Sequence, residues 1–178
     1  MKLEIEIYGA DVLRKPAKPV AKITDEIRAL AKDMIETMHD ADGVGLAAEQ
    51  VGREEAICVI DIPKDADKNK EAEKFNAPIA MPLILINPTI TASEGAQRGN
   101  EGCLSFPDIH GQITRAMQVT VKYIDLEGQP QTATARGLLA RAIQHELDHL
   151  AGTLMVDRFS QLQKMAVNGK LRRLAAAK

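Results

Sequence analysis

The sequence has no long apolar segment, little net charge and few of the residues that form disulfides. No apolar run approaches eighteen residues, so no membrane-spanning helix is predicted. A net charge of −2 and a pI near 6.1 give no global reason to expect nucleic acid as a sequence-specific partner. The two cysteines argue against a disulfide framework and favour a reducing compartment, the cytoplasm. The alternation of apolar and charged residues over 2–7 predicts a strand rather than a signal peptide.

The pattern of apolar residues predicts one domain of the α+β class. At 178 residues the whole chain, 1–178, is the size of a single domain. The predicted helices cover residues 25–40, 138–150 and 160–177. The predicted strands cover residues 56–61, 83–90, 118–126 and 130–136, the last two as a hairpin. The charged run between Pro63 and Pro82 is expected to be a mobile loop. We expect mainly antiparallel sheets packed around a central metal-binding helix.

Histidine is scarce, yet two of the four histidines stand four residues apart in His-Glu-Leu-Asp-His. Positions i and i+4 share one face of a helix, so His145 and His149 can bind the same metal ion. Glu146 stands between them, where a base for an activated water is needed. The segment predicts a core helix that carries a metal site.

A catalytic site of this kind needs a third protein ligand and one open position. After His149 the chain offers only Asp157, and the extended metalloprotease motif fails because residue 155 is methionine. Cys103 follows a polar, glycine-bearing stretch and its thiolate would be a good soft ligand. We therefore favour Cys103, with His110, His39 and Asp157 as alternatives. Cys58 lies in an apolar strand and is expected to pack in the core.

A third segment, Gly43 to Gln50, fits the dinucleotide-binding fingerprint formally, with Asp61 at a strand end downstream. The fingerprint must follow a strand, whereas residues 25–40 are predicted to be helical. We interpret the segment as a loop whose glycines let the backbone approach a ligand, with Gln50 offering a side-chain amide.

Together these three segments resemble the peptide deformylase family, which removes the formyl group from new polypeptides. The family pattern is Gly-x-Gly-Leu-Ala-Ala-x-Gln, then Glu-Gly-Cys-Leu-Ser, then Gln-His-Glu-x-Asp-His-Leu. All three are complete, in the family's order, at 43–50, 101–105 and 144–150. The resemblance implies N-formylmethionyl peptides as substrates.

The resemblance also implies the roles of particular residues. Cys103, His145 and His149 become metal ligands, and Glu146 becomes the general acid–base. The metal that the resemblance implies is Fe²⁺. Zn²⁺, Ni²⁺ or Co²⁺ could replace it, because two imidazoles and one thiolate suit all four cations.

Further roles follow from the first two motifs. The side chain of Gln50 and the backbone N–H of Leu104 would stabilise the developing oxyanion. The segment Gly43, Val44 and Gly45 would bind the substrate.

Three positions depart from the family pattern around the expected side-chain pocket. Arg141 and Gly99 stand where apolar residues are common, and His110 stands where arginine is common. We expect His110 and Arg141 to lie near the substrate, with Arg141 either extending out of the pocket towards solvent or narrowing its preference. Arg115 matches a family position and is expected to pair with Glu101 or Asp148.

The C-terminal stretch 160–177 is predicted to be a basic helix. Its cations, with the terminal lysine, are Lys164, Lys170, Arg172, Arg173 and Lys178. By resemblance to bacterial relatives it would dock on the ribosome, whereas composition alone fits an ordinary solvated helix equally well.

Two other functions remain open from sequence. One is a zincin-type metallopeptidase, which the missing downstream ligand disfavours. The other is a non-catalytic module with a structural zinc, which would need a fourth protein ligand such as His110.

Overall fold

The computed structural model describes residues 1–177, so Lys178 lies outside the described residues. Its α-helices are α1 (Asp25–Asp40), α2 (Lys70–Asn76), α3 (Gly137–Leu150) and α4 (Gln161–Ala176). Its strands are β1 (Gly45–Ala47), β2 (Ile57–Ile60), β3 (Leu83–Glu94), β4 (Gln97–Cys103), β5 (Phe106–Arg115), β6 (Gln118–Ile124) and β7 (Pro130–Arg136). Short 3₁₀ helices are η1 (Asp11–Arg14), η2 (Ala48–Val51) and η3 (Met155–Arg158).

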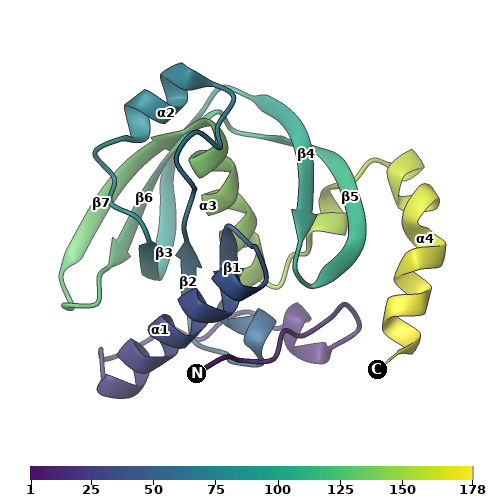
Figure 1. The fold of residues 1–178 in the computed structure, drawn as a ribbon, viewed down its shortest axis with the longest axis horizontal. Helices are drawn as coiled ribbons and strands as arrows, with labels where there is room; N and C mark the ends of the chain where they lie inside the picture. The colour runs from purple at the N-terminus through teal and green to yellow at the C-terminus, as the bar shows by residue number, and fades with distance from the viewer. Residues whose placement is uncertain (178) are drawn as a thin grey trace.

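The strands form two antiparallel sheets with α3 between them (Figure 1). The larger sheet has the order β1-β2-β3-β6-β7, and each neighbouring pair is antiparallel. The smaller sheet is the hairpin β4–β5. The single-domain α+β prediction is therefore confirmed, with the histidine-bearing helix at the centre.

Burial on both faces explains why β2 is a continuous apolar run. Cys58 and Ile60 belong to the core cluster that contains α3, whereas Ile57 and Val59 pack with α1. Side chains alternate along a strand, so the two helices cover opposite faces of the sheet. Cys58 is a fully buried core residue, as the sequence predicted.

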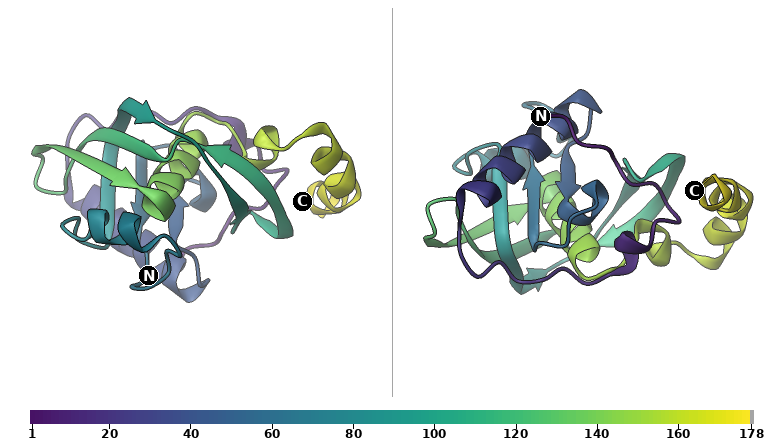
Figure 2. Two further views of the ribbon diagram at one scale, coloured as in Figure 1. Left: turned by 90° about the horizontal axis from the view of Figure 1, so that it is seen from above. Right: turned by 90° about the horizontal axis from the view of Figure 1, so that it is seen from below.

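A third core cluster joins the hairpin to both ends of the chain. Phe106, Ile109 and Ile113 of β5 pack against Leu13 and the η3 segment. Beyond the hairpin, α4 lies at the edge of the molecule (Figures 1 and 2). Ser160 caps this helix by accepting a hydrogen bond from the Gln163 N–H, and none of its residues is buried.

Several sequence predictions are wrong in detail. Residues 2–7 join neither sheet; instead the Leu3 N–H donates to Thr37 Oγ1 and the Glu6 N–H donates to the Gln50 carbonyl of η2. The charged run at 63–82 contains α2, which Asn69 caps. The expected loop at 43–50 forms β1 and η2.

The β4–β5 hairpin was not predicted, because β4 carries two glycines and four polar residues and shows little apolar alternation. Within residues 1–177, no helix has the length and apolar character needed to cross a bilayer.

Candidate metal centre

The metal-ligand candidates converge from two elements that are distant in sequence. His145 and His149 project from the same face of α3, and Cys103 ends strand β4. Cys103 Sγ lies 3.4 Å from His149 Nε2, and one ligand atom from each of the three residues lies within 4.8 Å of the others. Two imidazoles and a thiolate are a donor set that suits a divalent transition metal.

Two of the alternative third ligands bond to other residues, and the remaining one lies outside the cluster. His39 Nε2 lies 2.8 Å from Asp61 Oδ2, and Asp157 Oδ1 accepts from Arg14 Nη2 at 3.1 Å. His110 lines the adjoining cavity but is not part of the cluster. Among residues 1–177 no fourth histidine, cysteine or carboxylate joins these three, so the geometry matches a site with an open position.

Glu101 fixes the orientation of the first histidine. Its Oε1 lies 2.9 Å from His145 Nδ1, and a carboxylate can only accept, so Nδ1–H donates and Nε2 is left for a metal. Arg115 donates to both oxygens of the same carboxylate, from Nε to Oε2 and from Nη2 to Oε1, each at 2.9 Å. Burial opposes ionisation, but these hydrogen bonds outweigh it and hold the pKa of Glu101 well below its usual range.

Arg115 pairs with both of its predicted partners. Besides the bidentate bond to Glu101, its Nη1 donates to Asp148 Oδ2 at 2.6 Å. Arg115 is 6% exposed, so this is a buried network rather than a surface ion pair. Arg158 holds the outer side of Asp148, with Nη2 to Oδ1 at 2.9 Å.

Glu146 is buried beside the three ligand candidates, and its Oε2 has no hydrogen-bond partner among the described residues. Burial, only partly opposed by the charges of His145 and Arg115, raises the pKa of this carboxyl to about 7. Gly45 faces it from β1. A Cβ at Gly45 would overlap Glu146 Oε1 and lie 3.0 Å from Cδ. The Glu146 carboxyl can therefore occupy this position because residue 45 has no side chain.

The Gln50 amide is held in one orientation by the chain around it. Its Oε1 accepts the Ala47 N–H at 3.0 Å, which turns Nε2 towards Cys103 Sγ at 3.4 Å and Ser105 Oγ at 3.1 Å. Leu104 follows Cys103 in the turn of the hairpin, and its side chain lies against Gly43, where a Cβ would be 2.7 Å from Leu104 Cδ1. Ser105 was not singled out from sequence, although it closes the same motif.

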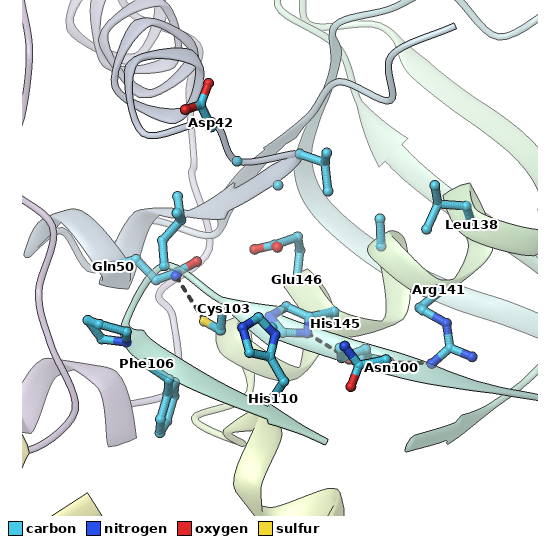
Figure 3. A pocket seen from close by; sticks show the side chains of 18 of the residues that line it. Asp42, Gln50, Asn100, Cys103, Phe106, His110, Leu138, Arg141, His145 and Glu146 are labelled. Atoms are coloured by element: carbon cyan, nitrogen blue, oxygen red, sulfur yellow. Dashed lines mark hydrogen bonds and ion pairs between the residues drawn. The ribbon is translucent and has the colours of Figure 1, made fainter. Parts of the chain in front are cut away.

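A cavity of about 450 Å³ opens over the cluster, between β1, the hairpin and α3 (Figure 3). Every residue assigned to substrate or catalysis from sequence lines it: Gly43, Val44, Gly45, Gln50, Leu104, His110, Arg141 and Glu146. Cys103 and His145 also line it. Seven other lining residues were not predicted, because they stand outside the recognisable motifs: Asp42, Asn100, Phe106, Pro107, Asp108, Leu138 and Ala142.

Arg141 does not extend out of the pocket, so that alternative is wrong. The residue is 7% exposed, and its Nη1 donates to Glu101 Oε2 at 2.6 Å and to the Ile113 carbonyl at 3.0 Å. Figure 3 shows it reaching along the cavity wall from α3. His110 is exposed, and its ring folds over Gly102, where a Cβ would lie 2.7 Å from Nδ1.

Comparison with known proteins gives one family. The polypeptide deformylase model matches residues 2–165. Peptide deformylases from Alkalilimnicola ehrlichii and Nitrosococcus oceani are 42% and 45% identical, over 97% and 94% of this chain and 90% and 93% of their own. The peptide deformylase structure from Thermus thermophilus superposes with a TM-score of 0.86 at 34% identity, covering all of both chains. The chain therefore belongs to the peptide deformylase family, the metal-dependent hydrolases that remove the N-formyl group from nascent polypeptides.

Proposed function

We propose that this chain carries out the family's reaction with Glu146 as its acid–base group, on peptides that begin with N-formylmethionine. The observation that supports this most directly is a buried carboxyl beside a Cys/His/His cluster at the floor of a cavity. Water is the nucleophile, the formyl C–N bond breaks, and formate and a free amino terminus leave.

The cluster Cys103, His145 and His149 is proposed to hold Fe²⁺ in the cell, with Zn²⁺, Ni²⁺ or Co²⁺ able to replace it. When bound, such a cation supplies the Lewis acidity that makes water a nucleophile near neutral pH. Metal content of the protein purified without oxygen, together with activity before and after exposure to air, tests the ferrous assignment. Loss in air that Co²⁺ or Ni²⁺ restores supports iron, and retained zinc with air-stable activity contradicts it.

Glu146 is proposed to take a proton from the attacking water and deliver it to the departing amine nitrogen. A general acid–base works best when its pKa lies near the working pH, and burial raises that of Glu146 to about 7. Gly45 supports this role because only glycine leaves room for the carboxyl at this position.

Gln50 and the backbone N–H of Leu104 are proposed to donate hydrogen bonds to the oxygen on which negative charge develops. The bond from Ala47 N–H to Gln50 Oε1 keeps Nε2 pointed towards Cys103. A donor fixed before the reaction needs no reorganisation when charge appears, which is why such groups are effective.

The peptide backbone of the substrate is proposed to lie along Gly43, Val44 and Gly45. β1 is an edge strand of the larger sheet and, within residues 1–177, pairs only with β2, so its other edge offers backbone groups to an extended peptide. His110 and Arg141 line the same cavity and would contact the first residues of that peptide.

Formate release from formyl-Met-Ala by the wild type and by Glu146→Gln tests this function. We expect release by the wild type and at least about a hundredfold less by the variant, with equal metal content. No release by a metal-loaded wild type would contradict the assignment. Cleavage of internal peptide bonds would instead favour a metallopeptidase.

The proposed setting is the cytoplasm, with the ribosome as a partner of α4. Within Gln161–Ala176 the helix carries four cations and no acid, and no residue of it is buried. Salt-dependent co-sedimentation with ribosomes that is lost on deleting 161–178 would support docking. Unchanged sedimentation after the deletion would contradict it.

A further inference from the structure

A buried arginine stands in the wall of the cavity that receives the substrate. Arg141 is 7% exposed and lines the same cavity as Glu146 and Val44. Apolar side chains usually line pockets of this kind, with a few polar groups that set specificity. A guanidinium here is therefore a candidate for such a polar group.

Gly99 makes room for this guanidinium. A Cβ at Gly99 would lie 3.0 Å from Arg141 Nη2, 3.3 Å from Cζ and 3.5 Å from Nε. The guanidinium thus lies along the bare Cα of strand β4. The two departures from the family pattern, glycine at 99 and arginine at 141, are one structural feature: the larger side chain occupies the space that the smaller one leaves.

Only some of the guanidinium's donors are used within the protein. Nη1 donates to Glu101 Oε2 and to the Ile113 carbonyl, and Nη2 donates to the Gln97 carbonyl at 3.4 Å. In residues 1–177 no acceptor pairs with Nε–H, so this donor is unused within the protein. A side chain bound in the cavity can therefore be offered an N–H donor.

The cavity that Arg141 lines also has apolar side chains in its wall. Leu138 lies on the same helix as Arg141 and lines the cavity with it (Figure 3), and Val44 and Ala142 are further apolar lining residues. A substrate side chain bound in the cavity would thus contact apolar side chains along its length and the charged N–H donor of Arg141. Methionine has only a weak acceptor, its thioether sulfur, for that donor.

We propose that Arg141 makes this pocket select uncharged side chains that carry a strong hydrogen-bond acceptor near their tip, and that N-formylmethionine sulfoxide is such a substrate. This proposal depends on the deformylase function proposed above. Oxidation of methionine to its sulfoxide replaces the weak acceptor by a strongly polar S=O at the same position. The Nε–H of Arg141 donates to that oxygen.

Glu101 explains why the preferred side chain is neutral rather than acidic. Its carboxylate already lies 2.6 Å from Arg141 Nη1, and a second carboxylate at the same guanidinium would be buried close to it. Two like charges in one buried site oppose each other. A neutral acceptor takes the unused donor without that repulsion.

The test compares kcat/KM for formate release from three formyl dipeptide substrates. They are formyl-methionine sulfoxide-Ala, formyl-Met-Ala and formyl-norleucine-Ala, where norleucine has the shape of methionine without an acceptor. For the wild type we expect the sulfoxide to exceed norleucine by about tenfold or more, as for a hydrogen bond to a charged donor. Arg141→Leu should bring this ratio to about one or below while formate is still released from the norleucine substrate.

Two further variants keep the test decisive. Gly99→Val/Arg141→Leu refills the emptied space with apolar atoms and should prefer norleucine even if Arg141→Leu alone folds poorly. Arg98→Leu removes an exposed cation that precedes Gly99 on β4. Arg98 does not line the cavity, so this variant should keep the wild-type ratio of sulfoxide to norleucine. Inhibition of the wild type by the deformylated products, sulfoxide against norleucine, measures the same preference without a substitution.

The outcomes separate this inference from the function on which it depends. Formate released equally well from the sulfoxide and norleucine substrates, or a sulfoxide preference that survives Arg141→Leu, would overturn the role of Arg141 alone. No formate from any substrate by the metal-loaded wild type would overturn the deformylase function, and this inference with it.

Discussion

Gly45 and Glu146 approach each other so closely that a Cβ on the glycine would overlap the carboxylate oxygen. The contact joins β1, an edge strand of the larger sheet, to the central helix α3. It places the buried carboxyl at the floor of the cavity beside the segment proposed to bind the peptide. Because Gly45 has no side chain, the proposed acid–base group Glu146 can lie next to the segment proposed to bind the substrate.

The first prediction concerns this contact. Gly45→Ala should lower kcat/KM for formyl-Met-Ala by about a hundredfold or more, because the methyl group displaces the Glu146 carboxyl from a position that catalysis needs to within about 1 Å. Metal content should stay unchanged, since the three heavy atoms nearest to a Cβ at Gly45 all belong to Glu146 and none to a ligand. Gly169→Ala, in the exposed helix α4, is the matched control, because a Cβ there meets nothing closer than 3.7 Å. Normal activity of Gly45→Ala would contradict the assignment of Glu146.

The second prediction concerns Glu101, which accepts hydrogen bonds from Arg115, Arg141 and His145. Glu101→Gln removes the charge that compensates two buried arginines, which should cost about 3–5 kcal/mol of unfolding free energy. Metal affinity should fall about 10–100-fold, because His145 loses the carboxylate that orients it. Urea unfolding and metal competition with a chelator measure the two effects. Metal affinity equal to the wild type would show that His145 does not need this partner.

The third prediction separates two arginines that share Asp148. Arg115 reaches both Asp148 and Glu101 and is buried, whereas the Arg158 side chain is 50% exposed and reaches only Asp148 in this network. Arg115→Ala should lower metal content and activity at least tenfold, because it leaves Glu101 under-compensated. Arg158→Ala should change activity less than twofold, since exposed ion pairs contribute about 0–1 kcal/mol. Equal effects of the two substitutions would contradict this distinction.

The fourth prediction is a pH dependence of stability that comes from Glu49. This side chain is fully buried, neither of its oxygens has a partner among the described residues, and burial raises its pKa to about 8. The folded state therefore binds a proton that the unfolded state releases above its pKa of about 4.5. The resulting stability is fully present below pH 4.5 and is lost as the pH rises through about 8.

Glu49→Gln should remove this dependence. The variant should gain stability over the wild type between pH 5.5 and pH 8.5, by on the order of 2–4 kcal/mol. Urea unfolding of both proteins at each pH measures the gain as a difference, in which the pH dependence of metal binding cancels. A difference that is constant across the range would show that Glu49 is ionised in the folded protein.

The sequence alone determined the chemistry of the centre and much of the fold. The i,i+4 spacing placed His145 and His149 on one face of a helix. The bounds of α1 agree with its apolar pattern, and those of β7 agree with the hairpin predicted from the turn before it. These features are local, because helical and strand periodicity fix which side chains share a face. The three motifs that carry the family resemblance could likewise be recognised in the sequence alone.

Only the tertiary structure decided which distant groups meet. Sequence left the third ligand open among four residues, and the packing of β4 against α3 brought Cys103 to the histidines. It likewise buried Arg141 against Gly99 and Glu101, where the sequence allowed it to reach solvent. The β4–β5 hairpin itself escaped prediction, because its stability comes from pairing and from the core beneath β5 rather than from its own composition. Contacts between residues forty or more positions apart depend on the whole packed core, and no local pattern encodes them.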